Sequence, residues 1–286
     1  MTYQTIFLNN ASEFLEHTLE HLAKNETRNN LMLGLALRLK DDPHAYTEHD
    51  PLMTIVSDEH GIISAMAIMT PPFPVIVESD PLNNDALEEL ARALISAGWR
   101  LSGVNGVVEA SDAFARIWEK YTAQVPRLQT RLRAYELRKV EELDYPEGEV
   151  RIAEERDAPK AAEFLNAMMD ELDLLGTRST PERALVNIRQ RRTFFWEVDG
   201  EQVSSTVANR EQIKSICISG VYTPPQHRRK GYARALVAEV SKEMLSRGFE
   251  LTNLFTDLAN PTSNKIYQEV GYQPVCDYHQ YLFETS

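Results

Sequence analysis

The chain has 286 residues, which is long for one compact domain and sufficient for two domains of about 140 residues each. Hydrophobic residues make up 43% of the sequence and charged residues 26%, a composition typical of a folded protein with a substantial core. The formal net charge is −13, and a field of that sign repels phosphate backbones. The composition therefore argues against a nucleic-acid partner.

The two cysteines, Cys217 and Cys276, lie in apolar runs and have neither CxxC nor Cys/His spacing. We expect no metal site and two buried free thiols in a reducing compartment. The N-terminal residues lack a basic segment followed by an apolar one, and no run approaches the ~18 apolar residues that a membrane span needs. The expected protein is cytoplasmic and has no membrane partner.

The first half of the chain predicts an ordered series of helices and strands. Helical periodicity over residues 11–40, broken by the polar run 25–30, predicts two helices. The other predicted elements follow in chain order: strands over 52–57 and 62–69 around a turn at Gly61, a strand over 75–77, a helix over 84–97, a strand over 104–108, a helix over 111–122 and a strand over 132–140.

The polar segment 143–149 contains proline and glycine and predicts a domain boundary, so we expect domains at 1–142 and 149–286. After it the order of elements begins again, which predicts an α/β fold with a mixed sheet in two copies. The predicted elements of the second copy are a strand over 150–152, helices over 157–172 and 181–191, strands over 193–198, 202–209 and 213–221, a helix over 234–247, a strand over 251–256, a helix over 262–270 and a strand over 280–283.

Residues 221–236 join a strand to a helix through a basic loop that contains glycine. The Pro-Pro pair at 224–225 ends the strand, because proline offers no donor to the ladder. The basic run 228–230 supplies positive charge, and Gly231 lets a ligand approach the backbone closely. The helix that follows offers unpaired amides and the positive end of its dipole. This combination predicts a diphosphate site.

Two short motifs occur in the second half, with a helix and a strand between them. Residues 228–233 read Arg-Arg-Lys-Gly-Tyr-Ala, and residues 260–272 contain Asn260, Tyr267 and the pair Gly271-Tyr272. They resemble the diphosphate loop, Arg/Gln-x-x-Gly-x-Gly/Ala, and the Asn…Tyr…Gly-Phe/Tyr helix of the GNAT superfamily of acetyltransferases. The resemblance covers about residues 150–283 and implies a tandem GNAT-like protein whose second domain uses acetyl-CoA.

The resemblance also implies roles for individual residues. Backbone amides of the loop would hold the CoA diphosphate, and Val221 N–H would polarise the thioester carbonyl. Tyr267 would protonate the CoA thiolate as the tetrahedral intermediate collapses, or would be a core aromatic. Asn260 would contact the pantetheine arm or cap its helix. The residues implied to bind the cofactor are Val221, Tyr222, Thr223, Arg228, Arg229, Lys230, Gly231, Tyr232, Ala233, Arg234 and Asn260.

The general base is open between Asp257 at the end of the fifth strand, Glu197 on the hairpin, and an ordered water. Asp257 is our first choice of side chain. The fourth strand, 216–221, contains no carboxylate, and Ser219 is the only hydroxyl on its C-terminal half. Cys217 is disfavoured as a nucleophile because no histidine lies near it in the sequence.

The acceptor is expected to be a primary amine of a small molecule or a peptide. Asp170, Glu171 and Asp173, at the end of the first helix of the second copy, would attract a cationic amine or would form a solvated helix end. The acceptor's identity, the acyl length and the oligomeric state are not predicted.

The first half has no counterpart of the basic loop. Its equivalent span, residues 74–81, is acidic, and a diphosphate there would meet Glu78 and Asp80 with no compensating charge. We interpret this half as a degenerate GNAT-like copy that does not bind CoA and shapes the acceptor cleft.

Three hypotheses follow for the whole chain: an N-acetyltransferase, a CoA-binding regulator without turnover, and an interaction module in which neither half is active. The intact basic loop argues against the third.

Overall fold

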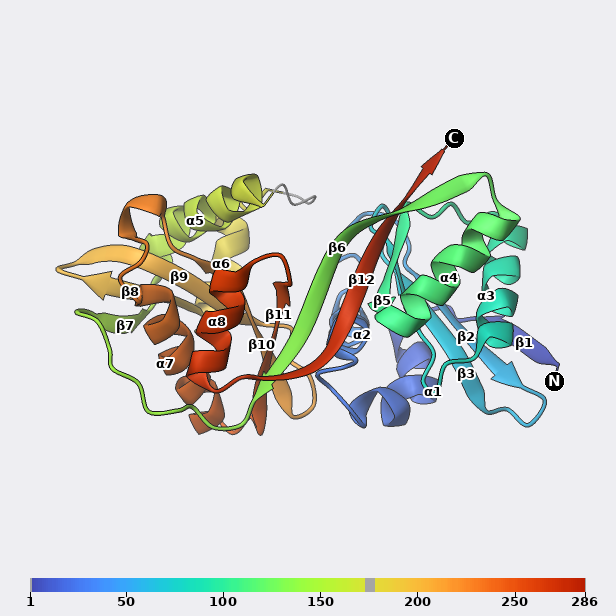
Figure 1. Cartoon of the computed structure of the whole chain (residues 1–286), viewed down its shortest axis with the longest axis horizontal. Helices are drawn as coiled ribbons and strands as arrows, with labels where there is room; N and C mark the ends of the chain where they lie inside the picture. Colours follow the sequence, from blue (N-terminus) through green and yellow to red (C-terminus); the bar gives the residue numbers. More distant parts are fainter. Residues whose placement is uncertain (1, 173–177, 286) are drawn as a thin grey trace. The chain divides into compact units, whose positions relative to one another are not determined.

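The computed structural model describes residues 2–172 and 178–285 (Figure 1). Contacts divide the chain into two compact units. Unit 1 comprises Met1–Ala134, Thr256–Ala259 and Val275–Ser286, and unit 2 comprises Tyr135–Phe255 and Asn260–Pro274. Within the described ranges, no helix combines the length and apolarity that crossing a membrane requires.

Unit 1 is a mixed sheet with two pairs of helices. Its first five strands are neighbours in chain order, and the pairs are antiparallel except β4 with β5, which is parallel. The strands are β1 (Tyr3–Phe7), β2 (Leu52–Asp58), β3 (Ile63–Met69), β4 (Val75–Glu78) and β5 (Gly103–Val107). The helices are α1 (Ala11–Ala23), α2 (Asn30–Asp41), α3 (Asn84–Ser96) and α4 (Val108–Tyr121).

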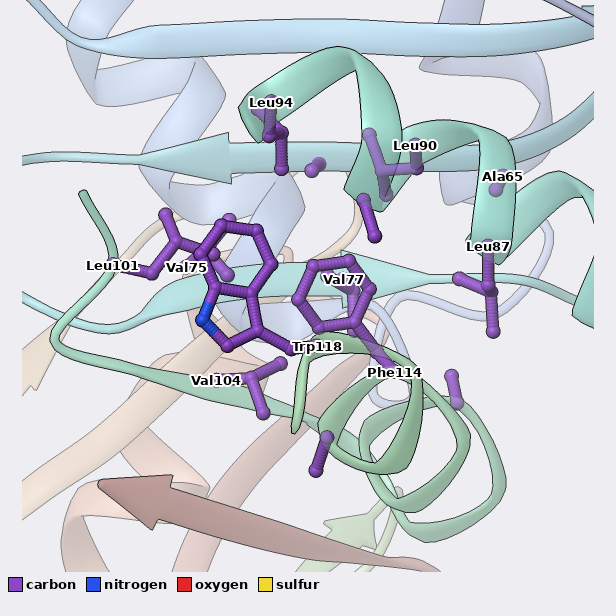
Figure 2. Close-up of a cluster of buried hydrophobic side chains, with 14 of the residues drawn as sticks. Ala65, Val75, Val77, Leu87, Leu90, Leu94, Leu101, Val104, Phe114 and Trp118 are labelled. Carbon is purple, nitrogen blue, oxygen red and sulfur yellow. The ribbon is translucent and has the colours of Figure 1, made fainter. Parts of the chain in front are cut away.

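Side-chain alternation along the strands gives unit 1 two cores, one on each face of its sheet. On β2, for example, Val56 packs into the cluster formed with α3 and α4, whereas Ile55 packs into the cluster formed with α1 and α2. The ring of Trp118 belongs to the first cluster and stacks on the ring of Phe114, with ring centroids 5.9 Å apart (Figure 2). The ring of Phe283 also stacks on Trp118, with ring centroids 5.8 Å apart. Both faces of the sheet are therefore covered.

Unit 2 repeats this plan. Its strands are neighbours in the order β11-β10-β9-β8-β7, and the pairs are antiparallel except β10 with β11, which is parallel. The strands are β7 (Glu149–Ile152), β8 (Thr193–Val198), β9 (Glu201–Asn209), β10 (Ser215–Tyr222) and β11 (Leu251–Asp257). The helices are α5 (Ala158–Glu171), α6 (Pro181–Arg189), α7 (Tyr232–Ser246) and α8 (Pro261–Val270), with short 3-10 turns at Glu155–Asp157 and Pro225–His227.

The two remaining strands do not follow the division into consecutive halves. The last strand, β12 (Gln273–Thr285), pairs antiparallel with β5, from Tyr278 opposite Val107 to Leu282 opposite Gly103. A Cβ at Gly103 would lie 2.0 Å from the carbonyl oxygen of Tyr281, so only glycine allows this pairing. Strand β6 (Gln124–Leu137) contributes its last three residues to unit 2. The contacts thus group residues 275–286 with the first unit, whereas the predicted range 149–286 assigned them to the second domain.

Candidate active site

Two parallel strands of unit 2 separate towards their carboxyl ends. Strand β10 pairs with β11 from Ser215 opposite Leu251 to Cys217 opposite Asn253. Beyond Cys217, β10 continues to Tyr222 without further pairing to the described residues of β11. On its other side β10 carries a bulge, because the four residues 219–222 oppose only the three residues 205–207 of β9. Gly220 lies in the bulge with φ +61°, a left-handed conformation that favours glycine.

Hydroxyl groups of β9 hold the bulge in place. Thr206 Oγ1 donates a hydrogen bond to the carbonyl of Ser219 at 2.9 Å. Ser204 Oγ donates to the carbonyl of Tyr222 at 3.0 Å and lies 2.8 Å from Thr223 Oγ1. Both ends of the bulge are thus fixed by side chains, so the separation of β10 from β11 is a built feature of the sheet.

The basic loop leads from this strand to α7 through two left-handed residues, Arg229 with φ +64° and Gly231 with φ +85°. Gly231 is the N-cap of α7, and its position offers no side chain to accept from the first-turn amides. The positive end of the α7 dipole therefore faces outward without a capping group. This arrangement fits an anionic ligand.

The side chains of the loop divide into two groups. Arg228 donates through Nε to the carbonyl of Thr223 at 2.8 Å and pairs with Glu171 at 2.5 Å. Arg234 pairs with Glu269 at 3.1 Å and donates to the carbonyl of Asp144. Arg229 and Lys230 form no ion pair with any residue of the described ranges, so they carry the unpaired positive charge of the loop. The prediction that Arg228 also supplies free charge differs from the structure, because its partner lies 57 residues away in the sequence.

Tyr267 lies on α8 and is 7% exposed. Its ring contacts Tyr272 edge-on, with ring centroids 6.0 Å apart. Burial, with a smaller contribution from Cys217, raises the pKa of the Tyr267 phenol well above its usual value. The Tyr272 hydroxyl lies within hydrogen-bond distance of Ser241 and Thr252, whereas the Tyr267 hydroxyl bonds to none of the described residues. The Tyr267 phenol is therefore protonated at neutral pH, and its O–H can donate a hydrogen bond to a ligand.

Asn260 is the N-cap of α8. Its Oδ1 accepts the backbone N–H of Ser263 at 3.0 Å, and its carbonyl accepts Asn264 Nδ2 at 2.7 Å. Of the two roles implied for Asn260, the capping role is confirmed. A contact between Asn260 and pantetheine would have to use Nδ2 as the donor, because Oδ1 is engaged in the cap.

The two side chains predicted as general bases, Asp257 and Glu197, have different surroundings. Asp257 ends β11, and its Oδ1 accepts the N–H of Ala259 at 2.8 Å in a local turn. Glu197 pairs with Arg151, which also binds Asp157, so its carboxylate belongs to an ion-pair cluster at the β7–β8 edge. The pKa of Arg151 is raised, chiefly by its hydrogen bond to Asp157.

The carboxylates expected to attract a cationic amine are engaged in ion pairs. Asp170 pairs with Arg178, and Glu171 pairs with Arg228. Asp173 lies outside the described residues. The two described carboxylates therefore form a neutralised helix end in this state.

Both cysteines are free thiols. Cys217 is fully buried at the last registered pair of β10 and β11, and Arg210 donates to its Sγ at 2.8 Å. Cys276 is only partly buried, and desolvation raises its pKa to about 12. Over the described ranges, no three His, Cys, Asp or Glu side chains come together as a metal site would need.

Comparisons with known proteins identify the second half. The sequence profile of the Acetyltransferase (GNAT) family matches residues 151–272. These residues form a GNAT acetyltransferase domain. A comparison with curated proteins finds no match.

Solved structures extend the similarity to nearly the whole chain. A GCN5-related N-acetyltransferase from Sphaerobacter thermophilus superposes with TM-score 0.66 at 16% identity, covering 98% of this chain and 94% of its own. A tandem GNAT protein from the clavulanic acid biosynthesis pathway gives TM-score 0.57 at 14% identity, covering 99% and 98%. A GNAT-family acetyltransferase from Colwellia psychrerythraea gives 0.58 at 11%, covering 99% and 100%. At such identities the likeness shows the fold, and the predicted mixed α/β tandem GNAT fold is confirmed.

The loop residues 228–231 and the uncapped first turn of α7 are called the cradle of unit 2. The counterpart of the cradle in unit 1 is the N-terminus of α3, which side chains cap. Helix α3 connects the parallel strands β4 and β5, as α7 connects the parallel strands β10 and β11. The N-cap of α3 is Asn83, whose Oδ1 accepts the N–H of Ala86 at 3.0 Å, and Ser79 Oγ accepts the N–H of Asn83. Because side chains already accept hydrogen bonds from these two amides, the amides cannot donate to an anion.

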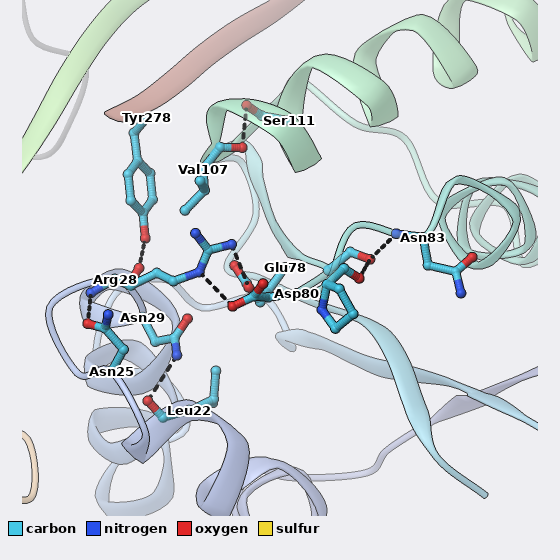
Figure 3. Close-up of polar contacts among 12 residues, drawn as sticks. Leu22, Asn25, Arg28, Asn29, Glu78, Asp80, Asn83, Val107, Ser111 and Tyr278 are labelled. Carbon is cyan, nitrogen blue, oxygen red and sulfur yellow. Dashed lines mark hydrogen bonds and ion pairs between the residues drawn. The ribbon is translucent and has the colours of Figure 1, made fainter. Parts of the chain in front are cut away.

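A cation compensates the charge of the acidic pair of unit 1, Glu78 and Asp80. Arg28, from the turn between α1 and α2, lies 3.2 Å from Glu78 and 3.3 Å from Asp80 (Figure 3). The carbonyl of Arg28 also accepts the hydroxyl of Tyr278. The expectation that these carboxylates lack a cation is wrong, because a cation 50 residues away in sequence reaches them.

Arg28→Met is expected to destabilise the protein by about 3–5 kcal/mol, because it leaves the carboxylate of Glu78 buried without its cation. Burial already raises the pKa of Glu78 above 4.5, and Arg28 lowers it only partly. Because the pKa of the Glu78 carboxyl is raised in the folded state, the free energy of unfolding falls as pH rises above the pKa of the unfolded chain. The stability lost in Arg28→Met should therefore be larger at about pH 8 than at about pH 4. Thermal and urea unfolding at both pH values measure it. Arg38→Met, which breaks an exposed pair with Asp42, is the control, and an equal loss in both variants would contradict the account.

A groove of about 360 Å³ lies along the later turns of α7, away from its N-terminus. It is lined by Val150, Ile152, Phe194, Glu239, Lys242, Glu243 and Ser246. Its charges pair within α7, as Glu239 does with Lys242, so it does not add to the cradle.

Proposed function

We propose that unit 2 transfers an acetyl group from acetyl-CoA to a primary amine of a small molecule or peptide. The observation that carries this proposal is the bulged end of β10, separated from β11, leading through left-handed Gly231 to the uncapped N-terminus of α7. A strand with a free side and a helix end with free amides are together what an extended arm that carries a diphosphate needs.

The cradle fits a diphosphate in charge and in shape. The amides of residues 229–234 and the α7 dipole would hold it, and the side chains of Arg229 and Lys230 would add screened attraction. The amide of Arg228 is not included, because it donates to the carbonyl of Pro225 at 3.3 Å. At Gly231 a Cβ would have space inside the protein, since its nearest atom, in Pro146, is 3.9 Å away. Glycine is required there by the backbone conformation and not by internal crowding.

The pantetheine arm would lie along the free side of β10. The carbonyls of Tyr222 and Thr223 already accept hydrogen bonds from Ser204 and Arg228. We therefore assign the backbone of Val221, within the bulge, to the arm and to the thioester carbonyl. Bound acetyl-CoA supplies a thioester that an unprotonated amine attacks directly, with no acyl-enzyme, once the two are held in register.

Tyr267 would donate its proton towards the departing sulfur. Its raised pKa keeps the phenol protonated, and its hydroxyl has no competing partner among the described residues. The amine must lose a proton before attack. Because Glu197 is held in an ion pair with Arg151, we propose that an ordered water takes this proton, and Asp257 remains the candidate side chain.

The pairing of Glu171 and Glu197 with arginines favours one alternative function, a CoA-binding regulatory protein without turnover. Both functions predict CoA binding, and only the first predicts transfer. The test is formation of free thiol from acetyl-CoA in the presence of a panel of primary alkylamines, amino acids and peptides. Amine-dependent thiol release with an acetylated product supports the transferase, and CoA binding without transfer to any member supports the regulator.

A further inference from the structure

The guanidinium of Arg228 connects three parts of unit 2. It donates to the carbonyl of Thr223 at the end of β10, pairs with Glu171 at the end of α5, and lies 5.8 Å from the centre of the Tyr222 ring. The same residue opens the loop whose amides form the cradle. The side chain is therefore held by protein groups at the place where a diphosphate would need cations.

Helix α5 brings the carboxylate of Glu171 to this place. Phe164 packs edge-on against Tyr222, with ring centroids 5.8 Å apart. A Cβ built on Gly220, in the bulge, would lie 3.7 Å from Leu165. The helix thus packs against the bulged end of β10, and its last residue, Glu171, meets the first residue of the loop.

A carboxylate in this position opposes binding of an anion. It neutralises Arg228, whereas the neighbouring Arg229 and Lys230 have no carboxylate partner among the described residues. The pair is about 40% exposed on both sides, with side-chain exposures of 38% and 44%, so water weakens it. A diphosphate is a stronger partner, because guanidinium binds phosphate oxygens in a bidentate manner.

We propose that Glu171 competes with the diphosphate of CoA for the guanidinium of Arg228. On binding, Arg228 exchanges the carboxylate for phosphate oxygens, and on release Glu171 recaptures it. Glu171 then acts as a built-in competitor that lowers CoA affinity and speeds product release, so that the domain is not held in its CoA complex. This inference rests on the proposed function, since it requires the cradle to bind CoA.

Calorimetric titration with CoA tests the competition. Glu171→Gln is expected to bind CoA about two- to fivefold more tightly than the unmodified chain, which is the range that an exposed ion pair provides. Stopped-flow dissociation should slow by a similar factor. Glu163→Gln removes the same charge from the same helix, where Glu163 pairs with Lys160, and should leave CoA affinity unchanged. Thermal unfolding of each variant checks that it is folded.

A double-mutant cycle separates exchange from long-range charge effects. In an Arg228→Met background, Glu171→Gln should no longer change CoA affinity, because the shared guanidinium is gone. The inference is overturned if Glu171→Gln leaves affinity unchanged or weakens it, or if it tightens binding equally in the Arg228→Met background. Absence of CoA binding by the unmodified chain would instead refute the proposed function itself.

Discussion

Tyr267→Phe is expected to lower acetyl transfer by about 10²- to 10⁴-fold, the usual contribution of a positioned acid, while CoA affinity changes little. The hydroxyl of Tyr267 bonds to none of the described residues, so removing it breaks no internal contact. Steady-state transfer from acetyl-CoA to the best amine of the panel measures the first effect, and calorimetry with CoA measures the second. Thermal stability should be preserved.

Tyr272→Phe is the matched control for this prediction. Tyr272 lies in the same cluster, but its hydroxyl lies 2.9 Å from Ser241 and 2.8 Å from Thr252. Its removal should cost about 1–3 kcal/mol of stability, because buried partners lose their hydrogen bonds, and should leave transfer nearly intact. Equal turnover of the Tyr267→Phe variant and the unmodified chain would remove Tyr267 from the chemistry.

Gly231→Ala is expected to weaken CoA binding by at least about tenfold. Gly231 has φ +85°, and an L-residue there costs about 1–2 kcal/mol, so the loop relaxes and its amides turn from their aligned positions. Each 1.4 kcal/mol lost from the interaction corresponds to about tenfold in affinity. Titration with CoA measures the change directly.

The control for Gly231 is Gly200, in the hairpin turn between β8 and β9. It has φ +81° and nothing within 4 Å of an added Cβ, so alanine there carries the same backbone cost. Gly200→Ala should lose similar stability and keep full CoA affinity. If both variants bind CoA equally well, the cradle does not depend on the conformation of Gly231.

Local patterns predicted most of the elements, because each depends on residues close in sequence. Helix α3 and strands β2 and β3 lie within one residue of their predicted bounds, and so does the start of α8. Strand β1 was missed because its five residues are mostly exposed and show no apolar alternation. Strand β12 extends over 13 residues, although only its last apolar part was predicted.

The pairing of the last strands could not be read from the sequence. Alternation along β6 and β12 indicates that they are strands, but it does not identify their neighbours. Contacts that decide the pairing join distant residues, such as Arg133 with Asp277 and His279 with Asp112. Consecutive halves were the simplest expectation, and the contacts of β12 with β5 replace it.

The candidate site shows the same limit. The sequence indicated the loop, Gly231 and the helix that follows, since these are adjacent in the chain. It did not indicate that Arg228 pairs with Glu171, or that Arg28 compensates Glu78, because each pair joins residues at least 50 positions apart. These two ion pairs engage the carboxylates of Glu78 and Glu171.

Titration of the full chain with CoA would show whether the N-terminus of α7 binds a diphosphate. We expect one site per chain, because the N-terminus of α7 is uncapped whereas Asn83 caps that of α3. Saturable binding with a stoichiometry of about one, lost in Gly231→Ala, is the expected result. No heat of binding at millimolar CoA, or two equivalent sites per chain, would contradict it.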